Sequence, residues 1–320
     1  MRFDNRSRVS TYISAWMPTN YPAHLSVAGY AAGGADSGGA LSGIDKIAFP
    51  ADTKSTLSAT LTSAKSGVTG FADSGVAGYS LGGSTNSNQI DKITFPADTK
   101  STLAATLSTS STAAAGFANS GVAGYYAGGY NGGLDTNYST IDKITFPADS
   151  KSTLSATLTA AQRGVVGFSN SGTAGYAAGG DGPNTNRIDK ITYSNDSKST
   201  LSATLTDPQR AGSGFADKGV AGYYCGGRNN GDAFLNRIDK ITFASDTKST
   251  LSAVLSRAKQ NDGSGGFADK TVAGYMCGGN GNTTSEIDKI AFSNDSKSTL
   301  AATLTSVRWS MAGYANEGLL

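Results

Sequence analysis

The stretch I-D-K-I-T-F-P-A-D-T-K-S-T-L, residues 90–103, decides the fold because its pattern returns six times along a chain of 320 residues. The shared pattern is I-D-K-I-x-[FY]-x-x-D-[ST]-K-S-T-L, and its internal spacing never changes. The copies begin at Ile44, Ile90, Ile141, Ile188, Ile238 and Ile287, at intervals of 46, 51, 47, 50 and 49 residues. A repeat of this length indicates that each unit is one supersecondary element packed against its neighbours.

Two further motifs accompany each copy. A-G-Y-x-x-G-G precedes it, with its tyrosine at Tyr30, Tyr79, Tyr125, Tyr176, Tyr223 and Tyr275. G-[FY]-[AS]-[DN] follows it, with its aromatic residue at Phe71, Phe117, Phe168, Phe215, Phe267 and Tyr314. In the second unit we expect strands over residues 66–75, 76–83, 89–98 and 101–108, because turn-forming Gly, Asn, Asp and Ser separate stretches rich in Val, Ile, Thr and aromatic residues. Four strands per unit predict a β-propeller.

The order of the motifs predicts how the ring closes. The first set of second, third and fourth strands begins at Val27, whereas the first copy of the initial strand begins near residue 66. The segment 309–317 is a last initial strand with no further strands after it. Joining it to the first set completes a sixth blade and leaves no open ring edge. We therefore predict an all-β, six-bladed propeller over residues 26–320, preceded by an arm over residues 1–25.

The Y-x-x-G-G motif, followed by a strand with an aromatic residue, resembles the kelch motif over residues 26–320. Leucine replaces the tryptophan that kelch repeats place at the start of the fourth strand, at Leu57, Leu103, Leu154, Leu201, Leu251 and Leu300. The regular, Gly-rich units are also similar to kelch-like propellers in virion proteins of tailed bacteriophages. That resemblance implies a structural protein on the surface of a phage particle, as a tail fibre, spike or capsid decoration.

Composition argues against several functions. The 26 Lys and Arg residues nearly balance 24 Asp and Glu residues, so we expect no nucleic-acid partner. No apolar run is long enough for membrane insertion, and the N-terminus lacks the apolar core of a secretory signal. One histidine, His24, and two cysteines, Cys225 and Cys277, offer little for metal or nucleophilic chemistry. We expect no enzyme, no cofactor and no metal, and we interpret the cysteines as buried thiols.

The repeated polar residues have a structural interpretation. Each unit carries Asp-Lys in I-D-K, such as Asp45 and Lys46, and a second set such as Asp52 and Lys54. Because each aspartate has a lysine nearby in sequence and lies beside turn-forming residues, we expect turns and local ion pairs. The repeated aromatic residues are predicted to fill the core between blades.

Sequence diversity is confined to two sets of loops. We call the end of the ring that carries them the variable face; it comprises residues 35–43, 84–89, 130–140, 181–187, 228–237 and 280–286, and residues 62–67, 108–113, 159–164, 206–211, 256–265 and 305–310. In the last but one of these loops, two extra residues lie between Ser256 at its start and Phe267, the aromatic residue of the strand that follows. The uniform face comprises the nearly invariant turns at residues 72–75, 118–121, 169–172, 216–219, 268–271 and 315–318, and at 50–55, 96–101, 147–152, 194–199, 244–249 and 293–298. Since drift alone would alter both faces, we expect recognition at the variable face.

Aromatic and basic residues are the candidate ligand-binding groups of the variable face: Tyr130, Tyr138, Phe234, Trp309, Arg163, Arg210, Arg257 and Arg308, with Lys65 and Lys259 nearby. Such side chains among amides and hydroxyls suit a host surface glycan or protein. The arm carries the apolar residues Tyr12, Ile13, Trp16 and Met17, which we interpret as an attachment to other virion proteins. A cellular lectin-like or scaffolding propeller is the alternative interpretation.

Overall fold

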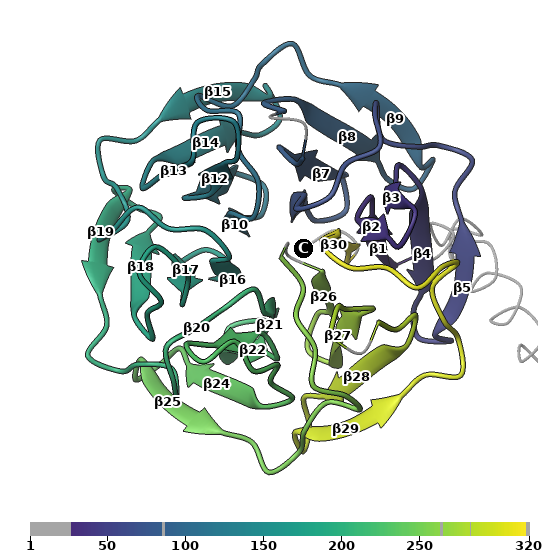
Figure 1. Cartoon of the computed structure of the whole chain (residues 1–320). Helices are drawn as coiled ribbons and strands as arrows, with labels where there is room; N and C mark the ends of the chain where they lie inside the picture. The colour runs from purple at the N-terminus through teal and green to yellow at the C-terminus, as the bar shows by residue number, and fades with distance from the viewer. Residues whose placement is uncertain (1–26, 85–86, 263–264, 282, 318–320) are drawn as a thin grey trace, which may run out of the picture.

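The computed structural model describes residues 27–84, 87–262, 265–281 and 283–317. Six sheets of four antiparallel strands surround a central axis, and these residues contain no helix (Figure 1). The first blade has the strand order β30-β1-β4-β5, in which β30 (Ala312–Asn316) pairs with β1 (Ala28–Ala32). The predicted all-β, six-bladed propeller, closed by its C-terminal strand, is confirmed.

Each blade runs from an innermost strand at the axis to an outermost strand at the rim. The innermost strands after β30 are β6 (Thr69–Asp73), β10 (Ala115–Asn119), β16 (Val166–Asn170), β21 (Ser213–Asp217) and β26 (Gly266–Asp269). The second strands after β1 are β7 (Ala77–Leu81), β11 (Ala123–Ala127), β17 (Ala174–Ala178), β22 (Ala221–Cys225) and β27 (Ala273–Cys277). The third strands are β4 (Ile44–Ala48), β8 (Ile90–Thr94), β14 (Ile141–Thr145), β18 (Ile188–Thr192), β24 (Ile238–Thr242) and β28 (Ile287–Ala291).

The outermost strands are short and differ from the predicted fourth strand. They are β5 (Thr53–Thr56), β9 (Thr99–Thr102), β15 (Ser150–Thr153), β19 (Ser197–Thr200), β25 (Thr247–Thr250) and β29 (Ser296–Thr299). In the second blade the strand ends at Thr102, so most of the predicted segment 101–108 lies outside it. The chain turns away because the Leu103 N–H donates to the Ile90 carbonyl and Leu107 is buried in the core.

Glycines allow neighbouring blades to approach closely. A Cβ atom on Gly124 would lie 2.0 Å from the Phe71 ring, so the phenylalanine of one innermost strand packs over the glycine of the next blade's second strand. Around the axis, a Cβ on Gly116 would lie 2.4 Å from the Gly70 carbonyl oxygen. These contacts show that the repeated glycines permit close strand approach.

The apolar core lies between blades, as predicted. One cluster joins Phe71 and Tyr79 of the second blade to Ile144 and Phe146 of the third. The Tyr79 and Phe146 rings stack with their centroids 5.2 Å apart. Because each blade buries both faces, removal of any blade would expose aromatic surface on two neighbours.

A carboxylate in the turn before each outermost strand holds the preceding blade. Asp98 accepts hydrogen bonds from the Tyr30 hydroxyl at 2.7 Å and from Lys46 Nζ at 2.6 Å. The same arrangement joins Tyr79 and Lys92 to Asp149, Tyr125 and Lys143 to Asp196, Tyr176 and Lys190 to Asp246, Tyr223 and Lys240 to Asp295, and Tyr275 and Lys289 to Asp52. The prediction of local ion pairs is therefore wrong for these charges, because each lysine pairs with an aspartate of the next blade rather than with one beside it in sequence.

The other repeated carboxylate, in I-D-K, is buried and also joins two blades. Asp91 accepts hydrogen bonds from Thr102 Oγ1 of its own blade at 2.8 Å and from the Thr62 N–H of the preceding loop at 3.1 Å. Lys65 Nζ lies 3.3 Å from it, and both side chains are fully buried. Burial opposes ionisation, but the Thr62 hydrogen bonds and the Lys65 charge outweigh it and lower the pKa of Asp91 to about 2.

Backbone hydrogen bonds tie the blades together at the variable face. They form a collar of six residues, one before each innermost strand: Gly67, Ala113, Gly164, Ala211, Asn261 and Ser310. The Ala113 N–H donates to the Gly67 carbonyl at 2.9 Å, and the Gly67 N–H donates to the Ser310 carbonyl at 2.8 Å. At the two-residue insertion, the Asn261 side-chain oxygen accepts the Met311 N–H at 3.2 Å. The C-terminal segment thus completes both the first blade and the collar.

Candidate functional site

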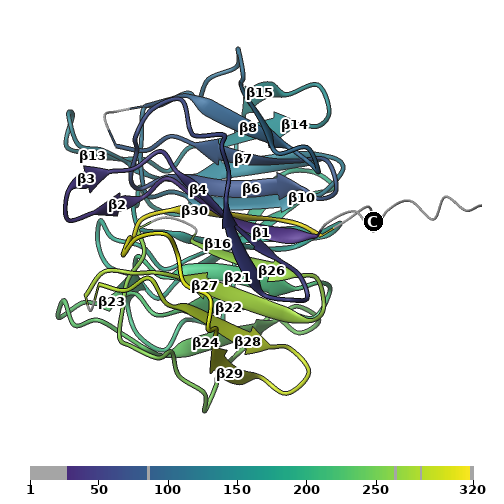
Figure 2. The ribbon, with the colours of Figure 1, turned by 90° about the vertical axis from the view of Figure 1, so that its right-hand side faces the viewer.

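The variable and uniform faces lie at opposite ends of the ring. Figure 2 shows the short ribbons β2 (Ala35–Asp36), β3 (Gly39–Ala40), β13 (Thr136–Asn137) and β23 (Arg228–Asn229) together at one end of the ring. Two more, β12 (Tyr130–Asn131) and β20 (Gln209–Arg210), also belong to the variable-face loops. All six are additions to the four-stranded blades, so this face departs most from the repeat.

Six pairs of residues surround the axis on the variable face. Each pair joins the residue before the collar to the residue after G-G of the same blade, through backbone contacts. The pairs are Trp309 with Ala35, Ser66 with Ser84, Thr112 with Tyr130, Arg163 with Asp181, Arg210 with Arg228, and Gln260 with Asn280. Because the backbone geometry repeats while the side chains differ, these positions present a different group on each blade.

A hollow of about 280 Å³ opens among these pairs, from the third blade to the sixth. Its lining includes the three arginines Arg163, Arg210 and Arg228. Tyr130, Gln260 and Asp262 also line it. Three cations and one carboxylate therefore face a common space, although the chain as a whole carries a net charge of only +2.

Two aspartates hold the arginines in place. Arg163 Nη2 lies 3.3 Å from Asp181 Oδ2, which is also 3.7 Å from Arg210 Nε. Arg210 Nη2 lies 2.6 Å from Asp232 Oδ1, and its Nη1 donates to Asn184 Oδ1 at 2.9 Å. With partners on several atoms, the Arg210 guanidinium is fixed in orientation.

Aromatic rings support the other two arginines. The Arg163 guanidinium lies over the Tyr130 ring at 4.5 Å, and that of Arg228 lies over the Phe234 ring at 4.8 Å. Among the described residues, Arg228 makes one side-chain hydrogen bond, from Nε to the Asp232 carbonyl at 3.2 Å. Stacking fixes the plane of its guanidinium while the terminal nitrogens keep donor capacity.

Asp262 belongs to the two-residue insertion and lies within the hollow. Gln260 Nε2 donates to its Oδ2 at 3.4 Å, a long hydrogen bond. Burial raises the pKa of the Asp262 carboxyl above its usual range, although Arg210, Arg163 and Arg228 act in the opposite direction. Among the described residues Asp262 has no ion pair within 4.0 Å, so it lines the same hollow as the three arginines without contacting any of them closely.

The structure brings Tyr130, Arg163 and Arg210 together in the hollow, and Phe234 supports it from beside Arg228. Sequence reasoning missed Arg228, Gln260 and Asp262 as site residues. Position in the repeat could have identified Arg228, because it directly follows G-G, as the candidate Tyr130 does in its own unit.

Three other candidates lie on the variable face but outside the hollow. Tyr138 is half-buried, and its backbone bonds Gly129 and Gln162. Trp309 pairs with Ala35, and Arg257, whose side chain is 49% exposed, pairs with Glu286 at 3.1 Å. The arm residues Tyr12, Ile13, Trp16 and Met17 lie outside the described residues.

Three basic side chains expected on the variable face are instead buried beneath it. Arg308 is 3% exposed, and its Nη2 lies 2.9 Å from Asp45 Oδ2. Lys65 and Lys259 are fully buried against the I-D-K aspartates of the second and sixth blades. They do not face solvent because this loop position points at a buried carboxylate. The prediction that Arg308 is a ligand-binding residue at the surface is therefore wrong, because its side chain is buried in the core against Asp45.

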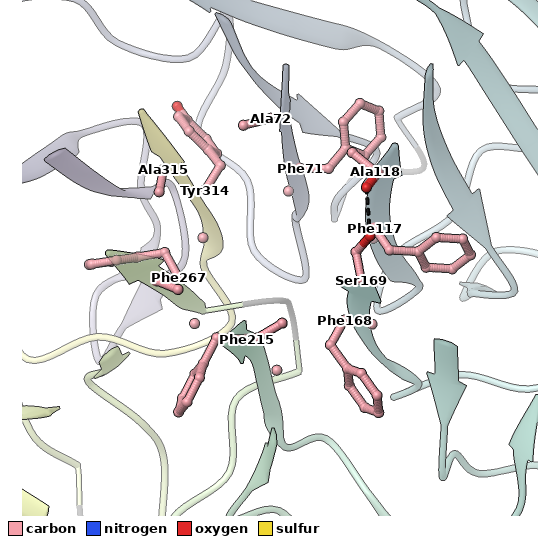
Figure 3. A pocket seen from close by; sticks show the side chains of 18 of the residues that line it. Phe71, Ala72, Phe117, Ala118, Phe168, Ser169, Phe215, Phe267, Tyr314 and Ala315 are labelled. Carbon is pink, nitrogen blue, oxygen red and sulfur yellow. Dashed lines mark hydrogen bonds between the residues drawn. The ribbon is translucent and has the colours of Figure 1, made fainter. Parts of the chain in front are cut away.

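The central channel offers little polar chemistry. It contains a cavity of about 160 Å³, and Figure 3 shows Phe71, Phe117, Phe168, Phe215, Phe267 and Tyr314 directed away from its axis. Small residues such as Gly70 and Ala72 line it together with the bases of these aromatic side chains, and Lys218 and Glu317 are charged residues of the lining. At the uniform-face end, burial raises the pKa of Glu317 to about 7, with Lys270 and Lys218 acting in the opposite direction.

The remaining reactive groups lie in the core. Cys225 and Cys277 are buried free thiols, as predicted, and burial raises the pKa of both. In the part of the chain that the structure describes, no three His, Cys, Asp or Glu residues gather as metal ligands would. Nor do the described residues include a helix with the length and apolarity to cross a membrane.

No protein-family model matches this chain, and no curated protein matches it. The class of protein is therefore defined by its fold, a closed six-bladed β-propeller of four-stranded blades. This architecture is consistent with a binding or scaffolding module, because the blades form a rigid ring that presents loops at its ends.

Proposed function

We propose that the chain is a non-enzymatic recognition module that binds its ligand at the hollow of the variable face. The observation that carries the proposal is that the repeated polar residues stabilise the ring, whereas residues that differ between units line the hollow. Repeated residues such as Tyr30, Lys46 and Asp98 bond one another between blades. Arg163 and Arg228 depart from the repeat and face a common hollow, as ligand-binding side chains on a rigid scaffold do.

The polarity of the ring supports an attachment role for residues 1–25. Ala28, at the start of β1, pairs with Ala48 and Asn316, so the chain enters the propeller at the uniform-face end. An arm that binds other virion proteins there would leave the variable face directed at a host glycan or protein. The kelch-like and phage-like sequence features support a place on the surface of a phage particle, as a tail fibre, spike or capsid decoration. In this role the chain would bind no nucleic acid or cofactor and would not insert into a membrane.

Removal of residues 1–22 tests the attachment role. We expect the melting temperature to stay nearly unchanged, because the six blades are complete without these residues, while incorporation into the parent particle falls. Calorimetry and mass spectrometry of purified particles measure the two effects. Full incorporation of the shortened chain would contradict the role, and absence of the full chain from particles would favour the cellular lectin-like or scaffolding alternative.

Substitutions on the two faces test the recognition role. With full-length protein on an array of glycans and peptides, Tyr130→Ala and Phe234→Ala are each expected to weaken binding by about 1–3 kcal/mol, because aromatic anchors carry much of an interface's energy. Val122→Ser and Val220→Ser are the matched controls, since these residues directly follow the uniform-face turns 118–121 and 216–219 and are 50% and 49% exposed. Binding that is lost only in the valine variants would place recognition on the uniform face instead.

A further inference from the structure

The charge of the hollow indicates what kind of ligand it accepts. Resting on the proposed function, we infer that the ligand is an acidic saccharide, and that the Asp262 carboxylate occupies part of the same site as a built-in competitor for its acidic group. Of the charged groups that line the hollow, Arg163, Arg210 and Arg228 are cationic and Asp262 alone is anionic. Asp181 and Asp232 contact the arginines but do not line the hollow.

An oxyanion fits this arrangement better than a neutral or cationic ligand. Guanidinium groups bind carboxylates, sulfates and phosphates through paired N–H donors in one plane. Arg210 is oriented by Asn184 and Asp232, and Arg228 is stacked on Phe234 with its terminal nitrogens unengaged among the described residues. The aspartates hold the cations in position from outside the lining, so a ligand meets donors that are already arranged.

The surroundings of the hollow favour a saccharide as the carrier of that oxyanion. The neighbouring loops supply amides and hydroxyls, among them Asn184 and Asn230, which bond each other at 3.0 Å, and Thr112 in the lining. Such groups match sugar hydroxyls, and the Tyr130 ring adds an amphipathic surface. A volume of about 280 Å³ lies near the lower end for small-molecule sites, which suits one acidic residue of a glycan more than an extended peptide.

Asp262 lines the hollow and is held there by only one long hydrogen bond among the described residues, as expected of a carboxylate that competes with the ligand's acidic group. The insertion that carries it occurs in one blade alone, and its carboxylate has a single long hydrogen bond, from Gln260 at 3.4 Å. It shares the lining with three cations and forms no close ion pair with any of them. An incoming carboxylate or sulfate can therefore take the unengaged terminal nitrogens of Arg228 without breaking a strong contact. Removing the Asp262 charge leaves the lining of the hollow without an anionic side chain, while Asp181 and Asp232 still hold the arginines from outside the lining.

The test uses the full chain on an array of matched glycans, such as 3′-sialyllactose beside lactose and sulfated beside unsulfated disaccharides, with oligoglutamate as an acidic peptide. Arg163→Gln and Arg228→Gln are expected to weaken binding of the acidic glycans about 10- to 100-fold, as loss of a charged hydrogen bond does. Asp262→Asn is expected to strengthen it. Arg257→Gln, on the same face but outside the hollow, is expected to leave binding unchanged.

The outcomes distinguish failure of the acidic-saccharide inference from failure of the recognition role. Equal binding of neutral and acidic glycans that still depends on the hollow would overturn the acidic ligand while leaving the recognition role intact. Hollow-dependent binding of oligoglutamate alone would assign a peptide and refute the saccharide. Weaker binding in Asp262→Asn would make Asp262 part of the site rather than a competitor. Binding to no array member counts against the inference, and binding insensitive to every variable-face variant refutes the recognition role itself.

Discussion

A chain that lacks residues 309–320 is expected to lose more than about 5 kcal/mol of unfolding free energy, a large share of the stability of an ordinary domain. The deletion removes β30, whose Tyr314 ring stacks on Tyr30 at 5.5 Å and is 3% exposed. Met311, which is fully buried, is lost with it, as is the Ser310 carbonyl that accepts the Gly67 N–H in the collar. The loss combines apolar burial, a strand ladder and the closure of the ring.

Denaturant unfolding and size-exclusion chromatography measure this effect. We also expect association of the shortened chains, because β1 becomes an unpaired edge with five residues open to pairing. A synthetic peptide of residues 309–317 serves as the matched control, since added strands can complete an open sheet edge. It should raise the melting temperature of the shortened chain. An unchanged cooperative transition without the peptide would show that closure contributes little.

The fold could be predicted from the sequence because the motifs that form the strands and turns occur six times with nearly constant spacing. Glycine beside an aromatic residue, and Asp-Lys at a fixed distance from a second aspartate, stand out from the loops by constancy alone. The strand count and the closure follow from the order of these motifs. The outermost strand was misplaced because Leu103 and Leu107 look like strand residues, whereas they leave the sheet to fill the core between blades.

The partners of the repeated charges could not be predicted, because a single unit does not reveal which neighbour it contacts. Lys46 lies near Asp52 in sequence, but in the structure it binds Asp98, 52 residues away. The hollow was harder still to predict. It depends on Arg228 and Asp262, which are unremarkable in sequence and converge only when the ring brings four blades to one axis.

The three buried cations beneath the variable face provide a second large effect. Arg308 donates to the carbonyls of Ala31, Gly33 and Gly43 and to Asp45, its one anionic partner among the residues that the structure describes. Asp45→Asn is expected to destabilise the protein by about 3–5 kcal/mol, because it leaves a guanidinium that is 3% exposed without a counter-charge. Chemical denaturation at neutral pH measures the loss.

The chain contains its own control for this substitution. In the third blade the equivalent loop position is Ser111, which bonds the Tyr126 hydroxyl, so Asp142 has no buried cation from that loop. Asp142→Asn should therefore cost only about 1–2 kcal/mol, for weakened hydrogen bonds from Ser108 and Thr153. Equal losses in the two variants would mean that the buried guanidinium needs no counter-charge.

A double variant separates the lost ion pair from the unpaired charge. Gln162 and Gln209 fill the Arg308 position in the fourth and fifth blades, where they are 3% and 2% exposed, so a glutamine fits there. Asp45→Asn combined with Arg308→Gln should regain most of the lost stability.

The contribution of Asp45 to the unfolding free energy also depends on pH. Burial opposes ionisation of Asp45, but Thr305, Arg308 and Thr56 outweigh it and lower its pKa below 3.8. Its contribution is complete above that pH and is lost as the pH falls through the lowered pKa, a loss that the double variant should not show.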